Sequence, residues 1–263
     1  MKMNIQTSNQ SFELLAPFYD AIYPPEQTIK QTVEFIEKLT KKDREKGREV
    51  KILEVFTRTG KYSIELAKRG FQVKGIDICK KMIKIAQRKA EKEGLEKISL
   101  ENITLEEEKG KYDLILLLNN IVSFINSSRE LKMLLINSKH LLEDNGKIIL
   151  HVVNYRVRRK KSSRYYPLKE IIIENKNYLV QRFLDLEPKL FFNINIMGKK
   201  GEKWGYFHKF SFPLTYYSLK NLQNHISSSG LKIEKIYGNY EEEKFNENNS
   251  KNLILVVSKR KQN

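Results

Sequence analysis

Residues 51–82 read KILEVFTRTGKYSIELAKRGFQVKGIDICKKM, and this stretch decides the fold that the sequence predicts. It opens with an apolar run at 52–55, continues through a turn at 57–60 and then favours a helix over 62–69. Gly70 suits the left-handed backbone position at which helices often end. The stretch therefore predicts a strand, a turn and a helix in that order.

A second strand is expected at 71–76, and the residue that follows it is Asp77. Asp77 comes 23 residues after Glu54. In doubly wound nucleotide-binding folds, a carboxylate that binds the ribose follows the first strand at about this separation. The two strands and the acid therefore predict a site for a cofactor that contains adenosine.

The next part of the chain repeats the same alternation of strand and helix. Apolar residues at helical spacing over 29–39 predict an amphipathic helix before the first strand. Further strands are expected at 98–101, 112–118 and 147–153, and the helix between the last two should end at Gly146. Repeated strands and helices predict a parallel sheet with right-handed crossovers.

The pattern changes at 154–213, where runs rich in Ile, Tyr, Phe and Val alternate with polar turns, as is typical of antiparallel strands. We expect one domain made of 1–153 and 214–263, interrupted by this antiparallel β insertion. The insertion should serve as a substrate lid or as a homodimer surface. Its strands are expected at 170–174, 178–185, 190–197 and 204–212, and they are followed by a helix at 218–229 and strands at 231–237 and 252–257.

The composition fits one large α/β core, because the chain has 263 residues of which 40% are hydrophobic. No apolar run approaches the roughly 20 residues that span a bilayer, and the first residues lack the hydrophobic block of a signal peptide. The one cysteine, Cys79, has no second cysteine with which to form a disulfide or a metal site. We therefore expect a soluble cytoplasmic protein without a metal or a membrane partner.

The formal net charge is +17, from 49 basic and 32 acidic residues. Most of the lysines alternate with apolar residues, which is typical of solvated helix faces. The exception is RVRRKK at 156–161, a cluster that suits the phosphates of RNA and equally suits a mobile loop or an acidic small substrate. This run keeps nucleic acid open as a partner, although a small-molecule substrate is favoured.

Residues 54–60, EVFTRTG, resemble the first motif of the class I S-adenosylmethionine-dependent methyltransferases, which reads as an acid, a spacer and Gly-x-Gly-x-Gly. Gly60 matches the last glycine, and Phe56 and Arg58 replace the first two. Arg58 either fills the cofactor's place or pairs its guanidinium with the cofactor's carboxylate. The resemblance implies S-adenosyl-L-methionine as cofactor and a Rossmann-like α/β fold with a mostly parallel seven-stranded sheet.

The resemblance also implies binding residues. Asp77 would accept hydrogen bonds from the ribose hydroxyls, Asn102 would accept one from the adenine amino group, and Tyr19 of the N-terminal cap (1–26) would cover the methionine end. Without the resemblance, these residues suit a helix cap, a turn and the core, respectively. The expected cofactor-binding residues are Tyr19, Glu54, Thr57, Arg58, Gly60, Asp77, Ile78, Met82, Asn102, Ile103, Leu118 and Asn119.

Candidate catalytic side chains are Asn120 and His208, with His151, Tyr206 and Tyr216 as further titratable groups. None has a companion at a diagnostic spacing, and each also suits a structural role. Because the sulfonium methyl group is already activated, in-line attack depends on position and desolvation rather than on a strong base. Three functions follow in this order: a methyltransferase with a small-molecule acceptor, a catalytically silent relative that binds or scaffolds, and an RNA methyltransferase.

Overall fold

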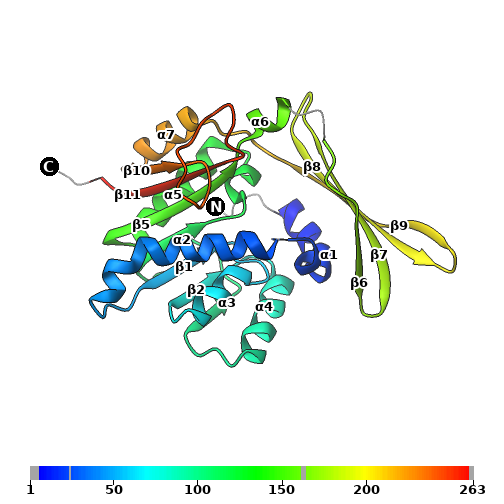
Figure 1. Ribbon diagram of the computed structural model, residues 1–263, viewed down its shortest axis with the longest axis horizontal. Helices are drawn as coiled ribbons and strands as arrows, with labels where there is room; N and C mark the ends of the chain where they lie inside the picture. The colour runs from blue at the N-terminus through cyan, green and yellow to red at the C-terminus, as the bar shows by residue number, and fades with distance from the viewer. Residues whose placement is uncertain (1–5, 24, 161–163, 261–263) are drawn as a thin grey trace.

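The computed structural model describes residues 6–23, 25–160 and 164–260 and is built around a seven-stranded sheet (Figure 1). The strand order is β10-β11-β5-β4-β1-β2-β3. Neighbouring strands run parallel except at β11, which pairs antiparallel with β5 and β10. The doubly wound fold class is thereby confirmed. The strands are β1 (Lys51–Val55), β2 (Gln72–Ile76), β3 (Ile98–Glu101), β4 (Tyr112–Leu117), β5 (Leu142–Val153), β10 (Leu231–Tyr237) and β11 (Asn252–Lys259).

Helices cover both faces of this sheet. Side chains alternate along a strand, so Leu53 of β1 joins a buried cluster with Leu131 of α5, whereas Ile52 joins a second cluster with Val33 of α2. None of the helices in the described part of the chain is long and apolar enough to cross a bilayer. The helices are α1 (Gln6–Ile22), α2 (Glu26–Glu45), α3 (Lys61–Lys68), α4 (Lys80–Lys92), the short 3-10 helix η1 (Ile121–Phe124), α5 (Ser128–Leu141), α6 (Tyr155–Lys160) and α7 (Leu219–Ser228).

The insertion forms a separate antiparallel sheet in the order β6-β7-β8-β9, as the sequence predicts. It stands beside α1 at one end of the molecule (Figure 1). Phe18 of α1 lies edge-on to Tyr178 of this sheet with ring centroids 5.1 Å apart, and Ile194 and Phe210 belong to the same buried cluster. The sheet is therefore packed onto the N-terminal helix. Its strands are β6 (Lys169–Ile173), β7 (Lys176–Asp185), β8 (Phe191–Lys200) and β9 (Lys203–Pro213).

The prediction that Gly146 ends a helix is wrong. The helix α5 ends at Leu141, and Gly146 lies inside β5, beside the backbone of β4. A Cβ at this position would lie 2.9 Å from the carbonyl oxygen of Tyr112 and 3.0 Å from that of Glu143. Glycine is therefore required here because two stretches of backbone approach closely. Inside a strand, glycine often marks such a close approach rather than the end of a helix.

Candidate active site

The turn between β1 and α3 has an unusual backbone. Phe56, Arg58 and Gly60 have φ angles of 59°, 55° and 73°, so the left-handed conformation recurs at every second residue. Residues with a side chain pay roughly 1–2 kcal/mol for this conformation. The turn therefore retains left-handed backbone at all three glycine positions of the motif, although two of them hold large side chains.

Glu54, at the carboxyl end of β1, holds this turn in place. Its Oε2 atom accepts hydrogen bonds from Thr57 Oγ1 at 2.8 Å, from Ser63 N at 3.1 Å and from Ser63 Oγ at 2.5 Å. Burial raises the pKa of Glu54 to about 7, although the bonds from Ser63 and Thr57 act in the opposite direction. Glu54 and Thr57 thus form the internal support of the turn.

Asp77 connects the turn with the end of β2. Its Oδ2 accepts from the backbone amide of Arg58 at 2.8 Å, and its Oδ1 accepts from the amide of Cys79 at 2.9 Å. Burial raises the pKa of the Asp77 carboxyl, with the two amides and Arg58 opposing that shift. A carboxylate offers about four lone-pair positions, so roughly two remain for a ligand. Asn102 donates its Nδ2 to the Asp77 carbonyl oxygen at 2.9 Å, which leaves its own Oδ1 as an acceptor.

The side chain of Arg58 is buried among aromatic rings. Its Nη1 donates to the hydroxyl of Tyr19 at 2.8 Å, and its Cζ lies 5.5–5.9 Å from the ring centroids of Tyr19, Phe124 and Phe12. Burial lowers the pKa of Arg58, but Tyr19 and Asp77 outweigh it, so the net shift is upward. The guanidinium is therefore a buried, charged group in contact with the N-terminal helix.

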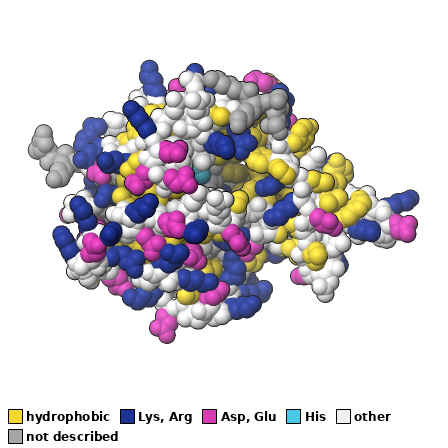
Figure 2. Space-filling model, viewed as in Figure 1, with side chains coloured by type: hydrophobic (Ala, Val, Ile, Leu, Met, Phe, Trp, Pro, Cys, Tyr) yellow, Lys and Arg dark blue, Asp and Glu magenta, His cyan; other side chains and the backbone are white. Residues whose placement is uncertain are grey.

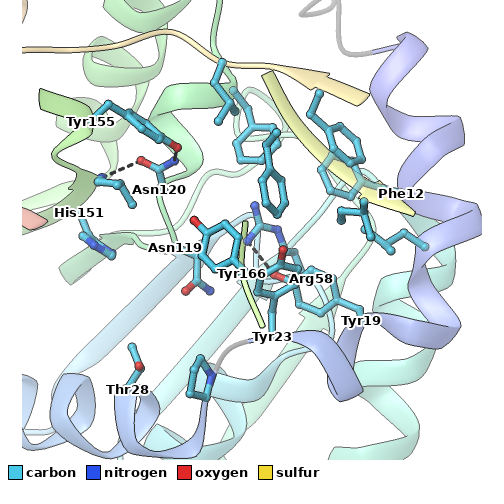
Figure 3. Close-up of a pocket in the computed structure, with 18 residues that line it drawn as sticks. Phe12, Tyr19, Tyr23, Thr28, Arg58, Asn119, Asn120, His151, Tyr155 and Tyr166 are labelled. Atoms are coloured by element: carbon cyan, nitrogen blue, oxygen red, sulfur yellow. Dashed lines mark hydrogen bonds between the residues drawn. The ribbon is translucent and has the colours of Figure 1, made fainter. Parts of the chain in front are cut away.

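A cavity of about 210 Å³ opens beside Arg58 (Figure 3). Its walls come from α1, from the turns after β1 and β4, from η1, β5 and α6, and from the second sheet. Arg58 is its one Arg or Lys, and the lining has no Asp or Glu among the residues that the structure describes. Eight of its 18 lining residues are Phe or Tyr: Phe12, Tyr19, Tyr23, Phe124, Tyr155, Tyr166, Phe192 and Phe212.

Two consecutive asparagines after β4 line the cavity, and both have left-handed φ angles, 55° for Asn119 and 60° for Asn120. Asn119 Oδ1 accepts from the hydroxyl of Tyr62 at 3.0 Å. Asn120 donates to the Tyr155 hydroxyl at 2.8 Å and accepts from the amide of Val153 at 2.8 Å; Ser123 supplies a third bond. The amide of Asn120 therefore joins β4, β5 and α6.

Some of the residues that the sequence singles out line the cavity, and the others do not. Tyr19, Arg58, Asn119 and Asn120 line the cavity. His208 lies in β9 outside the cavity lining, with its ring centroid 4.5 Å from that of Phe207. The other expected cofactor residues also lie outside the lining: Glu54, Thr57, Gly60, Asp77, Ile78, Met82, Asn102, Ile103 and Leu118. The binding roles of all these residues stay predictions.

His151 of β5 lines the cavity and is 8% exposed. Its Nε2 lies 3.2 Å from Oδ1 of Asn252, and its Nδ1 is buried without a partner in the described part of the chain. Burial lowers the pKa of His151, which favours the neutral ring. Within the described residues, no cluster of three or more His, Cys, Asp or Glu side chains is placed to hold a metal ion.

The sequence did not single out most of the aromatic wall. Phe12 and Phe212 stack with ring centroids 5.0 Å apart, although 200 residues separate them in sequence. The one available signal was the richness of the insertion in aromatic residues, which does not indicate which of them face inward.

The fold is that of the doubly wound α/β proteins, and the cavity adjoins the carboxyl ends of β1 and β4, the region in which ligands bind in such folds. A family model described as a methyltransferase domain matches residues 25–236. The chain therefore belongs to the methyltransferase domain family.

Known proteins resemble this chain at low identity. A curated protein of Geobacillus sp. (strain WCH70), named only as a candidate methyltransferase, is 27% identical over 146 residues, and the match spans 54% of this chain and little more than half, 57%, of that protein.

Two solved structures share the fold. The CcbJ methyltransferase of Streptomyces caelestis has a TM-score of 0.73 at 16% identity and covers 94% of this chain and 96% of its own. A sugar N-methyltransferase of Streptoalloteichus sp. has a TM-score of 0.71 at 12% identity and covers 92% and 93%, respectively.

Proposed function

We propose that this protein is an S-adenosylmethionine-dependent methyltransferase that acts on a small-molecule acceptor. The observation that carries the proposal is the position of the cavity. It adjoins Arg58, in the turn after β1, and Asn119, in the turn after β4. These two strands are neighbours, and the strand order reverses between them, because β2 and β3 follow on the side of β1 and β5 follows on the side of β4. Ligands of doubly wound sheets bind at this switch point, outside the carboxyl ends of the strands.

The residues beside the cavity fit the cofactor. Asp77 keeps roughly two acceptor positions, which suit the two ribose hydroxyls, and Asn102 keeps its Oδ1 for the adenine amino group. Arg58 uses one of its five N–H donors on Tyr19 within the described residues. Its remaining donors suit the methionine carboxylate, because a planar guanidinium pairs well with a carboxylate.

The bound cofactor would supply an activated methyl group on a sulfonium. The protein then has to hold the acceptor in line with that methyl group and keep water away. The aromatic wall of the cavity serves both purposes, and Phe192 and Phe212 of the second sheet complete it. The second sheet would therefore act as the substrate lid.

A second candidate function is a catalytically silent relative. It is favoured by one observation, the burial of the Arg58 guanidinium among Phe12, Tyr19 and Phe124 at a position that is glycine in the family motif. If this side chain remains there, it excludes the methionine end of the cofactor.

Calorimetric titration with S-adenosylhomocysteine separates the two candidates. The proposed enzyme binds it with micromolar affinity, and both Arg58→Gly and Asp77→Ala weaken binding at least tenfold. The silent relative gives no heat as wild type and gains binding in Arg58→Gly, because the blocking side chain is gone.

An RNA substrate has less support. The basic run lies mostly in α6, and Lys161 is outside the described residues. Arg156 forms an ion pair with Glu247 at 3.3 Å, and Arg158 lies over the ring of Tyr166 at 5.1 Å. These side chains are engaged within the protein, which favours the small-molecule acceptor.

The homodimer stays a prediction. Hydrophobic side chains gather on the second sheet (Figure 2), where Ile172, Tyr206 and Phe207 are exposed. Such a surface suits a subunit contact, and sedimentation of the purified protein would test it.

A further inference from the structure

Among the hydrogen-bonding side chains of the cavity lining, most acceptors are engaged within the protein and several donors are not. Asn119 Oδ1 is taken by Tyr62, and Asn120 Oδ1 is taken by Val153 and Ser123. His151 Nδ1 is buried away from the space. Most of the side-chain acceptors of the lining are therefore already occupied or hidden from a ligand.

Hydrogen-bond donors, in contrast, remain. The hydroxyls of Tyr19 and Tyr155 each accept a bond, from Arg58 and Asn120, respectively, and neither donates its own proton to a residue that the structure describes. Asn119 keeps its Nδ2 group. Of the five N–H donors of Arg58, one binds Tyr19 and two would pair with the methionine carboxylate of the proposed cofactor, so two remain for a second ligand. A ligand that satisfies these groups must bring acceptor atoms.

The charge of the cavity has the same implication. Arg58 is the one Arg or Lys of the lining, and no carboxylate among the described lining residues faces it across the space. In the protein without cofactor, a protonated amine would meet a guanidinium and find no anion, so its desolvation would be uncompensated. An oxyanion would meet the guanidinium and the adjoining phenol proton of Tyr19, and both groups form strong charge-assisted bonds with an anion.

The size and the wall restrict the rest of the ligand. A cavity of about 150 Å³ lined by apolar residues is known to hold benzene, and this cavity measures about 210 Å³. One ring with small substituents therefore fits. The aromatic wall favours a planar ring, because aromatic pairs gain energy from edge-to-face and offset contacts beyond the area they bury.

We propose that the cavity binds a one-ring aromatic molecule that carries an oxyanion, a carboxylate or a phenolate, and that this molecule is the methyl acceptor. The second half of this inference rests on the proposed function. In the transfer, an oxygen lone pair of the acceptor forms the new O–CH₃ bond, and the electron pair of the broken S–CH₃ bond remains on sulfur. An oxyanion has no proton to lose, so the reaction needs no general base, in agreement with the lack of an exposed base in the described lining.

The test is binding, measured by calorimetry and by saturation-transfer NMR on the full chain. The probes are benzoate, benzylamine, which has a similar shape and the opposite charge, and cyclohexanecarboxylate, which has the charge without the aromatic ring. Benzoate should bind at one site, at least tenfold more tightly than benzylamine and severalfold more tightly than cyclohexanecarboxylate. Equal or tighter binding of benzylamine would overturn the proposal.

Tyr19→Phe tests where in the protein benzoate binds. It keeps the ring and removes the phenol donor beside Arg58, so benzoate should bind about fivefold more weakly, whereas Tyr206→Phe, on the exposed face of β9, should leave its affinity unchanged. Benzoate affinity that is the same in wild type and Tyr19→Phe would overturn the assignment to this cavity.

Titration with S-adenosylhomocysteine is run in parallel, and benzoate is titrated again into protein saturated with S-adenosylhomocysteine. Benzoate that binds only in the absence of S-adenosylhomocysteine occupies the place of the methionine carboxylate, and this outcome would overturn the inference about the acceptor. Protein that binds S-adenosylhomocysteine but not benzoate overturns the present inference alone. Protein that binds benzoate but not S-adenosylhomocysteine supports the ligand class and overturns the methyltransferase.

Discussion

The backbone amide of Arg58 donates a hydrogen bond of 2.8 Å to the Oδ2 atom of Asp77. This bond joins the turn after β1 to the end of β2, and both residues are buried. Asp77 therefore has a structural role in the protein without any ligand, in addition to the proposed contact with the ribose.

Asp77→Ala should destabilise the protein even in the absence of cofactor. The amides of Arg58 and Cys79 would lose their acceptor, and a buried unsatisfied donor costs about 1–3 kcal/mol. We expect a fall in Tm of roughly 3–8 °C, measured by calorimetry. Asp144→Ala is the control, because the Asp144 side chain is 100% exposed, and its Tm should match wild type. An unchanged Tm in Asp77→Ala would contradict the structural role of Asp77.

Phe56→Gly should be more stable than Phe56→Ala. Both variants lose the same packing, but alanine retains the cost of the left-handed backbone at φ 59°, roughly 1 kcal/mol, and glycine does not. Urea denaturation of the two variants measures the difference.

Met133, exposed in α5, supplies the control for this pair. There, the order should be reversed, since alanine stabilises a helix interior relative to glycine by about 1 kcal/mol. If alanine were the more stable residue at both positions, the left-handed turn would be wrong.

Asn120→Ala should lower stability by about 3 kcal/mol. It removes hydrogen bonds to Ser123, Val153 and Tyr155 and leaves the half-buried amide of Val153 without its side-chain acceptor. The expected loss is seen in urea denaturation of the protein alone, and the exposed Asn177→Ala should differ from wild type by less than about 0.5 kcal/mol. A stable Asn120→Ala variant would reopen a purely catalytic role for this amide.

Glu54→Gln should change how stability depends on pH. In the folded protein, the carboxyl holds its proton to about pH 7, against an ordinary pKa of 4.5, because burial disfavours the charged form. Between pH 4.5 and 7 the folded state binds more protons than the unfolded chain, so wild-type stability falls as the pH rises.

Glutamine does not ionise, so the Glu54→Gln variant should lack this fall in stability as the pH rises. Relative to wild type, the Tm of Glu54→Gln should therefore rise by roughly 3 °C or more between pH 5 and pH 8. The exposed Glu234→Gln variant should keep the wild-type slope. Parallel curves for wild type and Glu54→Gln would show that the carboxyl titrates normally.

Much of the fold could be predicted because its signals are local. The apolar runs of β1 and β4 and the alternation of strand and helix depend on residues that are close in sequence. The prediction for Gly146 failed because glycine occurs both at the ends of helices and where two backbones approach closely. Only the position of the neighbouring strand shows that the second reason applies here.

The site could be predicted only in part. The closeness of the turn at 56–60 to Asp77 could be predicted because their spacing is set by one βαβ unit, whereas the binding role of Asp77 stays a prediction. The aromatic wall was not, since Phe12 and Phe212 meet only after the insertion packs on α1. Whether the amide of Asn120 is free also depends on partners in β5 and α6, which its own sequence neighbours do not reveal.

The cavity wall runs in sequence from Phe12 to Leu214. During synthesis on the ribosome, the central strands β1 to β5 can emerge and pair well before β9 is translated, but the enclosed space cannot exist until β9 and Leu214 have left the exit tunnel. A nascent chain stalled before that point would have much of the parallel sheet and an open groove in place of the cavity. A ligand that requires the enclosed cavity therefore cannot assist the early steps of folding.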